Sequence, residues 1–455
     1  MEHSLHFIGI GGIGMSAIAK IMLHNGFRIS GSDVVESHLT RELCAGGAQI
    51  RYGHSAENIP ADAEAVVYSS AVKMDNVEMQ AAKARGLKIY KRAEMLAYLM
   101  SVKEGIGVAG AHGKTTASAM LATMLELNGC DPTVVIGGML PVIGGNAKAG
   151  EGPNLVAEAD ESDGTFLLLK PKISLVTNIE ADHLDYYQNL ERIIAAFSQY
   201  LEQIPADGFS VVCYDCEILR TLCGKIPGRY ISYGLGEFGD YQARNLQHEN
   251  NGVSADVYYL GSLLGRLRMN VVGEHNISNA LGAIAIGREL GLSFEECAVG
   301  LANFTGTGRR YELLAERNGL RVVDDYAHHP TEIAATIQAA RDQGVRKMLA
   351  VFQPHRYSRT QEMYQDFAAA LMAADRILLC ELYPAFEKPI PGVSAKLVVN
   401  ALRELGHGRV DYAATMEEAF SFLEREIKDE ELLLLMGAGN VRSLSERYAA
   451  YIKEK

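Results

Sequence analysis

The sequence lacks any excess of positive charge. Its 455 residues include 43 lysines and arginines against 56 aspartates and glutamates, a formal net charge of −13, and they contain no basic block. Sequence-independent binding to nucleic acid needs clustered lysines and arginines that displace counterions from the phosphate backbone. We therefore expect no nucleic-acid partner.

A long uninterrupted hydrophobic run is also missing. The best candidate, Leu5–Leu23, is interrupted by glycines between Gly9 and Gly14, has no positively charged leader and carries Lys20. Signal peptides and membrane-spanning helices have different flanks and unbroken apolar runs. We expect this stretch to form a strand, a turn and a helix, and we expect a cytoplasmic protein with no membrane partner.

Paired cysteines are missing as well. The seven cysteines are odd in number and scattered along the chain. Cys213 and Cys216 form one C-x-x-C pair without a second pair, and Cys223 is too far along for a ribbon-type zinc site. We expect buried or incidental thiols in a reducing compartment.

What the sequence does contain is an alternation of short apolar strands and helical stretches, which is typical of parallel α/β sheets. The length predicts about three domains. Residues Gln242–Val272 break the rhythm with polar–apolar alternation and no helix, so we expect a small antiparallel insert there. Phe304–Glu312, rich in glycine and threonine, is the predicted linker.

The first motif is the G-x-G-x-x-G of Gly9–Gly14, which follows an apolar strand and precedes a helix. Glycines let the backbone approach a diphosphate, and the helix start offers free N–H groups. Asp33, after the second strand, could accept a ribose hydroxyl. The motif alone also fits a tight structural turn, and it does not identify the diphosphate.

The second motif, "GAHGKTT", lies between a strand at Ile106–Gly110 and a helix at Thr116–Leu127. Small residues expose N–H groups, Lys114 could contact the β and γ phosphates, and the Thr115 hydroxyl could bind Mg²⁺. A standard G-x-x-x-x-G-K-[ST] loop would have a glycine at Val108, so a plain strand-to-helix turn remains open from these residues alone.

Acidic residues follow two further strands of this region. They are Glu158, Asp160, Glu161 and Asp163 after the first, and Glu180 and Asp182, with Asn178 and His183, after the second. Mg²⁺ prefers oxygen ligands, and doubly wound sheets bind ligands at their strand ends. A histidine is a less usual ligand for this ion, and a charged loop without Lys114 nearby would be read as solvated surface.

The last third of the chain places polar motifs after three strands: "DDYAHHPTE" (Asp324–Glu332), "QPHRYSRTQ" (Gln353–Gln361) and "MGAGN" (Met436–Asn440). Pro330 and Asn440 also suit plain helix starts. Arginines, histidines and an aspartate at strand ends predict a pocket for an anionic substrate that carries an amine or a carboxylate. If the helix after "QPH" has begun, Arg356 and Arg359 share one face.

Together these segments resemble the Mur ligase family over essentially the whole chain. The resemblance rests on eight segments in the family's order: "HFIGIGGIGMSAIA", "GSD", "GAHGKTT", "EADESDGTFL", "TNIEADHLD", "GEHNISNA", "DDYAHHPTE" and "QPHRYSRT". The family's loop is a short G-x-x-G-K-[ST]-T that begins at Gly110, which explains Val108. The turn after "SVVCYDCE" departs from the family's Asp-Asp-Pro, so Asp215 is the remaining candidate for a ribose contact there.

The resemblance implies three α/β domains. They are an amino-terminal Rossmann-like domain that binds a UDP sugar (residues 1–101), a central P-loop ATPase-type domain with the small antiparallel insert (102–308), and a carboxyl-terminal Rossmann-like domain that binds an amino acid (309–455). We expect the domains to close on their substrates, with one hinge near Thr305–Gly308. The oligomeric state that we expect is a monomer or a weak homodimer.

The resemblance also implies the site residues. ATP would bind Gly110, His112, Gly113, Lys114, Thr115, Thr116, His275, Asn276, Arg309 and Asp324. The UDP sugar would bind Gly11, Gly12, Gly14, Met15, Ser32, Asp33, Ser69 and Ser70. Thr115 and Glu158 would hold one Mg²⁺ and His183 a second, and no carbamylated lysine can be placed. The catalytic residues would be Lys114, His183, His328, Arg356 and Arg359, with Asp324 also facing the amino acid.

The implied activity is the ATP-dependent addition of L-alanine to the lactyl carboxylate of UDP-N-acetylmuramate through an acyl phosphate, the first peptide step of peptidoglycan precursor synthesis. Three alternatives stay open. A relative could add a preformed peptide in wall recycling, Gly9–Gly14 and Asp33 could serve an NAD-dependent dehydrogenase, or the chain could be a non-catalytic nucleotide-binding regulator.

Overall fold

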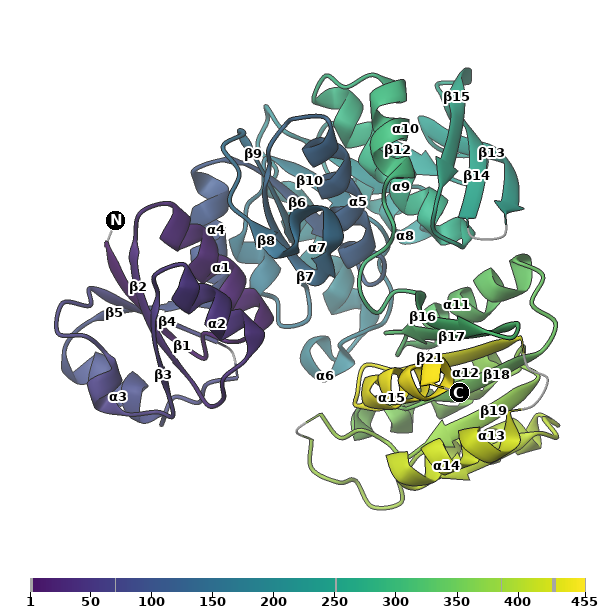
Figure 1. Ribbon diagram of the computed structural model, residues 1–455. Helices are drawn as coiled ribbons and strands as arrows, with labels where there is room; N and C mark the ends of the chain where they lie inside the picture. The colour runs from purple at the N-terminus through teal and green to yellow at the C-terminus, as the bar shows by residue number, and fades with distance from the viewer. Residues whose placement is uncertain (1–2, 70, 250–251, 386, 428–430, 455) are drawn as a thin grey trace. The chain divides into compact units, whose positions relative to one another are not determined.

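A computed structural model describes residues 3–69, 71–249, 252–385, 387–427 and 431–454. It contains three β-sheets with helices packed against them (Figure 1). Backbone contacts divide the chain into two compact units. One unit comprises Met1–Arg244, Asp256–Leu267 and Ser278–Phe304, and the other comprises Asn245–Ala255, Arg268–Ile277 and Thr305–Lys455.

The amino-terminal sheet is parallel and five-stranded, in the order β3-β2-β1-β4-β5. Its strands are β1 (Ser4–Ile8), β2 (Arg28–Asp33), β3 (Gln49–Tyr52), β4 (Ala65–Tyr68) and β5 (Lys88–Lys91). Its helices are α1 (Ile13–His24), α2 (His38–Ala45), α3 (Val77–Ala84) and α4 (Arg92–Ser101). The strand order reverses at β1, and such a switch point opens a crevice at the carboxyl ends of the strands. The turn Gly9–Gly14 follows β1 at this crevice, so the Rossmann-like prediction is confirmed.

The central sheet has ten strands in the order β15-β14-β13-β12-β11-β10-β6-β9-β7-β8. They are β6 (Glu104–Ala109), β7 (Thr133–Leu140), β8 (Gly145–Lys148), β9 (Asn154–Glu158), β10 (Ile173–Val176), β11 (Phe209–Cys213), β12 (Tyr230–Gly234), β13 (Tyr241–Glu249), β14 (Gly252–Tyr259) and β15 (Ser262–Met269). The helices are α5 (Lys114–Leu127), α6 (Leu184–Tyr187), α7 (Leu190–Glu202), α8 (Glu217–Cys223), α9 (Glu274–Glu289) and α10 (Phe294–Ala302). The run from β12 to β7 is parallel, and β8 closes its edge antiparallel to β7.

Strands β13–β15 form the small antiparallel insert that the sequence predicts. β14 and β15 are joined by two residues, Leu260 and Gly261, with φ of 47° and 80°. Two positive φ values in a two-residue loop match the twist of a β-hairpin, and so short a connection joins antiparallel strands.

The carboxyl-terminal sheet has six strands in the order β16-β17-β21-β18-β19-β20, with β16 antiparallel at one edge. The strands are β16 (Glu312–Arg317), β17 (Leu320–Asp325), β18 (Met348–Phe352), β19 (Arg376–Cys380), β20 (Val410–Ala413) and β21 (Leu432–Met436). The helices are α11 (Pro330–Asp342), α12 (Tyr357–Leu371), α13 (Lys396–Glu404), α14 (Met416–Glu426) and α15 (Val441–Glu454). Apart from β16, the strand pairs are parallel, which confirms the third α/β domain.

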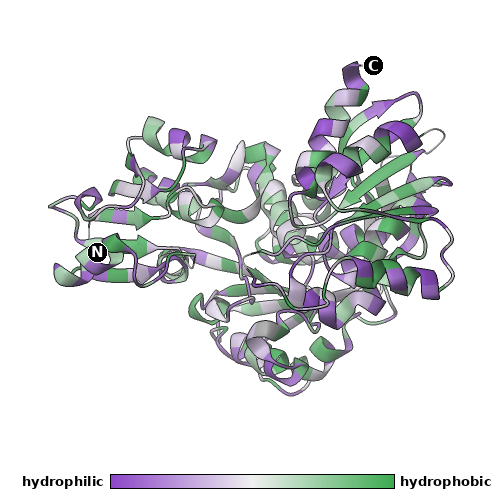
Figure 2. Ribbon diagram, turned by 90° about the horizontal axis from the view of Figure 1, so that it is seen from below, coloured by the Kyte–Doolittle hydropathy of each residue, from purple (hydrophilic) through white to green (hydrophobic). Residues whose placement is uncertain are grey.

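Both faces of this sheet are buried, which explains its nearly continuous apolar strands (Figure 2). Along β18, Ala350 and Phe352 pack in one core with α11, α12 and α13, whereas Leu349 and Val351 pack in the other core with α14 and α15. Adjacent residues of a strand point to opposite faces, so the two cores alternate along the strand.

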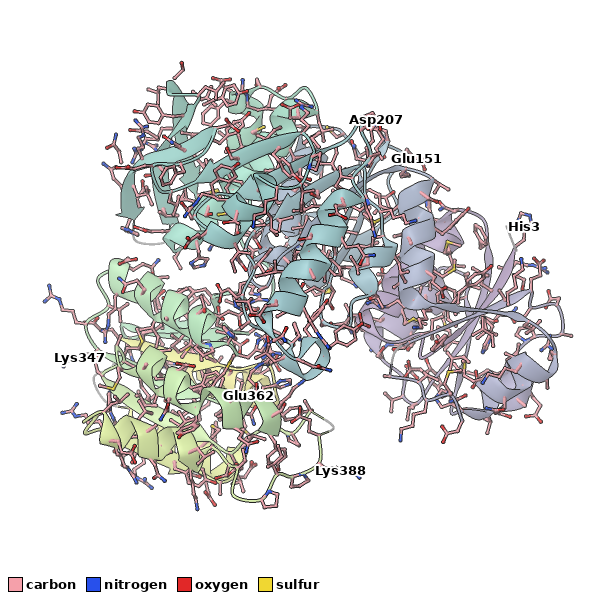
Figure 3. All side chains as sticks on the ribbon, turned by 180° about the vertical axis from the view of Figure 1, so that it is seen from behind. His3, Glu151, Asp207, Lys347, Glu362 and Lys388 are labelled. Carbon is pink, nitrogen blue, oxygen red and sulfur yellow. The ribbon has the colours of Figure 1, made fainter. Side chains whose placement is uncertain are left out.

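The surface carries charged side chains such as Glu151, Asp207, Lys347 and Glu362 (Figure 3). All seven cysteines are free thiols. Among the described helices, none has the length and apolar character that a membrane span requires.

Candidate active site

The predicted phosphate loop connects β6 to α5, and two of its glycines are required by the geometry. Gly110 has a φ of 132°, and a Cβ atom there would lie 2.1 Å from Thr177 Oγ1. Gly113 has a φ of 85°, and a Cβ atom there would lie 2.8 Å from Asn279 Oδ1. Positive φ favours glycine, and the close neighbours leave no room for a side chain. The loop therefore begins at Gly110, two residues after Val108.

The end of strand β10 holds this loop in place. Thr177 Oγ1 and Asn178 Nδ2 both donate to the carbonyl of His112, at 2.5 and 3.0 Å. In return the His112 N–H donates to Asn178 Oδ1 at 2.9 Å, and the His112 ring lies 3.5 Å from Glu180. The carboxyl ends of neighbouring parallel strands lie at the same edge of a sheet, so residues that are 65 and 66 positions away from His112 fix the shape of its loop.

Lys114 is the first residue of α5, and its ammonium group is well satisfied. Nζ donates to the carbonyls of Gly110 and Ala111, at 2.6 and 3.2 Å, and to Glu161 Oε1 at 2.8 Å. A lysine folded back over its own loop lies where the phosphates of a nucleotide bind in P-loop proteins. Its acidic partner, Glu161, is one of the carboxylates that the sequence places after β9, although the family resemblance gave it no role.

Burial and charge oppose each other at this ion pair. Burial raises the pKa of Glu161, whose side chain is only 3% exposed, to about 7, although Lys114 acts in the other direction. Burial lowers the pKa of Lys114, but the carboxylates of Glu161 and Asp160 raise it more, so the lysine remains charged. The second oxygen of Glu161, Oε2, is buried and has no hydrogen-bond partner among the described residues.

Thr115 and Glu158 bring a hydroxyl and a carboxylate together beside Lys114. Thr115 Oγ1 donates to Glu158 Oε2 at 3.1 Å, and the Gly137 N–H donates to Glu158 Oε1 at 2.6 Å. Two oxygen ligands of this kind suit Mg²⁺. The structure thus places two of the three predicted metal ligands side by side.

His183, the third predicted ligand, lies at the same group of carboxylates. Its Nε2 is 3.9 Å from Glu161 Oε1 and 3.6 Å from Asp182 Oδ2. The residue caps α6 with a φ of 54°, a conformation that costs free energy in a residue with a side chain. Strain of this kind concentrates at functional sites. Thr116, which follows Thr115 in the first turn of α5, is partly buried.

The turn predicted to bind the UDP sugar is closed by its own aspartate. The Gly11 N–H donates to Asp33 Oδ2 at 2.7 Å, and a Cβ atom on Gly11 would approach that oxygen to 2.9 Å. Gly12 is the N-cap residue of α1, and Gly14 packs against the Arg92 side chain. Met15 is buried, Ser69 lies behind Gly9, and Ser70 falls outside the described residues.

Ser32 is part of a buried polar network centred on Glu78. The Glu78 carboxylate accepts from Ser32 Oγ at 2.8 Å and from Asn58 Nδ2 at 3.0 Å, and it contacts ring nitrogens of His6 and His54 at 2.9 and 3.0 Å. Burial alone would raise the pKa of this fully buried carboxyl group, but the hydrogen bonds lower it to about 2. The network fixes the Ser32 hydroxyl at the end of β2.

In the carboxyl-terminal domain, Glu332 gathers the residues of "AHHPTE". It accepts from the N–H groups of His328 and His329 at 3.0 and 3.3 Å, and its Oε2 lies 3.2 Å from His328 Nδ1. Arg310 approaches Glu332 Oε1 at 3.4 Å and stacks over the Tyr326 ring. Pro330 occupies the first turn of α11, as predicted.

Arg356 and Arg359 flank the start of α12, but the helix begins only at Tyr357. Arg356 is its N-cap, with a φ of 72°, and Arg359 is 8% exposed inside the first turn. The two residues therefore do not both belong to a helix face. Burial lowers the pKa of His355 to about 3, helped by the positive charges of His328, Arg359 and Arg356, so this group of residues favours an anion.

Asp324 and Arg309, both predicted to contact the nucleotide, are bound to each other. Asp324 is fully buried and accepts from Ser445 Oγ at 2.6 Å, from Arg442 at 3.1 Å and from Arg309 Nε at 3.3 Å. Arg309 also donates to the carbonyl of Gly437 at 2.6 Å. Asp325, which follows Asp324 in the chain, accepts from the N–H groups of Ala327 and Tyr311, and burial raises the pKa of Asp325 to about 6.

Helix α9 carries the residues predicted near the adenine. His275 is exposed in its first turn, and the Asn276 side chain donates to the carbonyl of Val272 at 2.7 Å. Asn279, three residues further on, lies against Gly113 and was missed by the sequence-based site. Arg310 was missed too, although the second arginine in "TGRRYE" was a visible signal, whereas Glu161 was named among the acidic residues of "EADESD" but was given no role of its own.

Comparison with known proteins places these features in one family. Three family models match consecutive parts of the chain: "Mur ligase family, catalytic domain" at residues 4–104, "Mur ligase middle domain" at 108–287 and "Mur ligase, glutamate ligase domain" at 309–439. Together they cover most of its length.

Individual relatives agree. The chain is 47% identical to a UDP-N-acetylmuramate–L-alanine ligase of Pelotomaculum thermopropionicum, over 100% of this chain and 98% of the relative. It is 46% identical to the ligase of the same name from Carboxydothermus hydrogenoformans, over 97% and 95%. The crystal structure of UDP-N-acetylmuramate–alanine ligase from Thermotoga maritima matches with a TM-score of 0.83 and 31% identity, over 99% of this chain and 100% of that one. With the short phosphate loop and its carboxylates in place, the chain belongs to the Mur ligase family.

Proposed function

We propose that this protein joins L-alanine to the lactyl carboxylate of UDP-N-acetylmuramate in an ATP-dependent reaction that releases ADP and phosphate. This is the first peptide step in the synthesis of the peptidoglycan precursor. The observation that carries the proposal is the arrangement of Lys114, Thr115 and Glu158 at one edge of the central sheet, in a chain whose relatives are ligases for these substrates. ATP dependence follows from the same assignment.

The first chemical step activates the lactyl carboxylate. A carboxylate oxygen attacks the γ-phosphorus of ATP, a C–O–P bond forms, and the bond to the β–γ bridging oxygen breaks as ADP leaves. The loop N–H groups and Lys114 stabilise the charge that develops on the phosphoryl oxygens. To do so, Lys114 exchanges its contact with Glu161 for the phosphates.

The site residues fit Mg²⁺, which we propose as the metal. Thr115 and Glu158 would hold one ion, because their oxygens are adjacent. His183 would hold a second ion, because its ring nitrogen lies beside the carboxylate of Glu161. The buried, unpartnered Oε2 of Glu161 is a further oxygen beside them. A bound Mg²⁺ supplies positive charge that offsets the charge of the phosphates.

The second step forms the amide. The neutral amine of L-alanine attacks the acyl carbon, the tetrahedral intermediate collapses, phosphate leaves, and the nitrogen loses one proton. We propose that Arg356 and Arg359 bind the carboxylate of L-alanine, since Arg forms paired hydrogen bonds with carboxylates. His328, held by Glu332, positions the amine or takes its proton.

Sequence-based placement of the other residues stays a proposal. The UDP sugar would bind at Gly11, Gly12, Gly14, Met15, Ser32, Asp33, Ser69 and Ser70, and ATP would also contact Gly110, His112, Gly113, Thr116, His275, Asn276, Arg309 and Asp324. We keep the domain boundaries of 1–101, 102–308 and 309–455, supported by the end of α4 at Ser101 and the division after Phe304. We place the enzyme in the cytoplasm, where ATP and UDP sugars are available, as a monomer or weak homodimer.

The alternatives are not favoured. The curated relatives with 46–47% identity over nearly the whole chain are named for L-alanine, not for a peptide. A dehydrogenase would leave Lys114, Thr115 and Glu158 without a role, and in this structure the Asp33 carboxylate closes its own turn.

The deciding experiment measures ADP release by the purified chain with ATP, Mg²⁺, UDP-N-acetylmuramate and L-alanine, omitting one component at a time. Release should require all of them, and the product should gain the mass of one alanine residue. Formation of the amide without ATP, or equal rates with a preformed peptide in place of L-alanine, would contradict the proposal.

A further inference from the structure

Arg356 has a backbone conformation that must be held by its surroundings. Its φ of 72° lies in the left-handed region, which is unfavourable for a residue with a side chain. The residue is the N-cap of α12, and its side chain provides no capping hydrogen bond. Arg356 lies within the segment Pro354–Ser358, next to His355. The contacts that fix this segment therefore also fix the direction in which the Arg356 side chain leaves the backbone.

Tyr383, after strand β19, provides the first part of that support. The Arg356 N–H donates to the carbonyl of Tyr383 at 2.8 Å, and the Tyr383 N–H donates to the carbonyl of Pro354 at 2.9 Å. These two bonds form an isolated parallel bridge between His355 and Tyr383. Their rings are stacked as well, with centroids 5.7 Å apart and an interplanar angle of 11°.

Glu387 provides the second part, at the first turn of α12. Its Oε2 accepts from the Ser358 N–H at 3.0 Å, and its Oε1 accepts from the Ser358 hydroxyl at 2.6 Å. The first N–H groups of a helix have no partner within the helix, and the helix dipole favours a negative charge there. A carboxylate from another loop thus completes the start of α12, and its own N–H is bound to the carbonyl of Pro384.

Arg359 lies one residue beyond Ser358 on the same turn. The turn is further fixed by Thr360, whose N–H and hydroxyl both donate to the carbonyl of Arg356, at 3.2 and 2.7 Å. Ser358 therefore stands between the two arginines, and a shift of Ser358 would move both. A guanidinium pair needs a defined separation to bind one carboxylate with paired hydrogen bonds.

We infer that Glu387, acting through Ser358 and together with Tyr383, is a positioning residue that sets the two arginines for the carboxylate of L-alanine. The inference rests on the proposed function, because it takes Arg356 and Arg359 as the amino-acid site. Glu387 does not touch the amino acid. It holds the turn from which the arginines project.

The test compares Glu387→Gln with wild type in full-length protein, using ADP release with each substrate varied in turn. Glutamine can accept only one of the two hydrogen bonds from Ser358, so we expect the KM for L-alanine to rise about tenfold. The KM values for ATP and UDP-N-acetylmuramate should stay within about twofold, as should kcat, because the other sites are untouched. The matched control is Glu404→Gln, an exposed glutamate of α13, which should change none of these values.

Ser358→Ala is the second variant, and it removes the hydroxyl that Glu387 binds. It should raise the KM for L-alanine in the same way, and the double variant should be little worse than Glu387→Gln alone, because both changes break one contact. Fully additive effects, an unchanged KM for L-alanine in both variants, or an equal rise in all three KM values would overturn the inference.

Arg359→Lys separates this inference from the proposed function. If Arg359→Lys raises the KM for L-alanine while Glu387→Gln and Ser358→Ala do not, the inference fails and the amino-acid site stands. If ADP release by wild type does not depend on L-alanine at all, the proposed function has failed instead. Urea unfolding of each variant shows whether a raised KM comes with a loss of folding.

Discussion

Thr115 at the start of α5 and Glu158 at the end of β9 are joined by a hydrogen bond of 3.1 Å from the Thr115 hydroxyl to Glu158 Oε2. Forty-three residues separate them in sequence, yet the parallel pairing of β6 with β9 brings the two strand ends together. Lys114, next to Thr115, contacts Glu161 from the same acidic segment. The phosphate loop and its acidic partners therefore form one constellation across adjacent strands.

Replacing Thr115 tests the metal site. We expect Thr115→Ala to lower kcat/KM by about 100-fold, because one oxygen ligand of the proposed Mg²⁺ is lost, whereas Thr115→Ser should stay within about tenfold of wild type. The measurement is ADP release over a range of Mg²⁺ concentrations. Wild-type rates and Mg²⁺ dependence in Thr115→Ala would show that this hydroxyl does not serve the metal.

Replacing Gly110 tests the shape of the phosphate loop. A methyl group would meet Thr177 Oγ1 at 2.1 Å, and φ is 132°, so Gly110→Ala should lower ADP release by more than about 100-fold. Gly129→Ala is the control, since Gly129 has a φ of 73° but no atom within 4 Å of its Cβ position. It should cost only about 1 kcal/mol of stability and leave activity intact. Equal effects of the two changes would mean that close packing at Gly110 does not matter.

Glu78 makes a pH-dependent contribution to stability. Its pKa is about 2 in the folded protein against 4.5 for the ordinary group, so the unfolded state binds its proton first as the pH falls. The carboxylate should contribute about 3 kcal/mol above about pH 5, and this contribution should be lost as the pH falls from there toward 2.

Urea unfolding of Glu78→Gln between pH 7 and pH 4 measures that contribution. The variant should be less stable than wild type by about 3 kcal/mol at pH 7, and the difference should shrink at pH 4. Glu36→Gln, which removes an exposed glutamate of the same domain, should change stability by less than about 1 kcal/mol at either pH. A difference for Glu78→Gln that is constant with pH would rule out the carboxylate as its cause.

The buried carboxylate of Asp324 is predicted to stabilise the folded state in addition to its proposed contact with ATP. Its buried carboxylate binds Ser445, Arg442 and Arg309, so Asp324→Asn should lower the free energy of unfolding by about 3 kcal/mol. Asp366→Asn, an exposed aspartate of α12, should have almost no effect on stability. If Asp324→Asn instead raises the KM for ATP or L-alanine without a loss of stability, the aspartate contacts substrate, as the family resemblance implies.

The sequence was sufficient for the architecture because the fold follows local patterns. Apolar runs such as Leu432–Met436 mark strands buried on both faces, and the glycine turn after β1 marks a crossover to a helix. The insert at β13–β15 was visible as a change of period. These features depend on residues that are near one another in the chain.

Contacts between distant segments were not predictable in the same way. Glu78 lies in the first turn of a short helix that also carries Gln80 and Lys83, so from the sequence it looks like a surface charge. In the structure it is fully buried among side chains from β1, β2 and the loop after β3. The start of α12 at Tyr357 could not be read from "QPHRYSRT" either, because the loop that carries Tyr383 and Glu387 decides it. The adjacent arginines Arg309 and Arg310 both stack over the Tyr326 ring, yet Arg309 donates to the carbonyl of Gly437 whereas Arg310 approaches Glu332, and only the tertiary structure shows this division.

The two cores that share β18 make this strand sensitive to length. Deleting a single codon within Met348–Phe352 would exchange the side chains that face α12 with those that face α15, because successive residues alternate between the faces. The same deletion would turn the segment that follows, with His355 and Arg356, toward the wrong side of the sheet. We therefore expect an insertion or deletion in β18 to destabilise the domain, even where a conservative apolar substitution in this strand is tolerated.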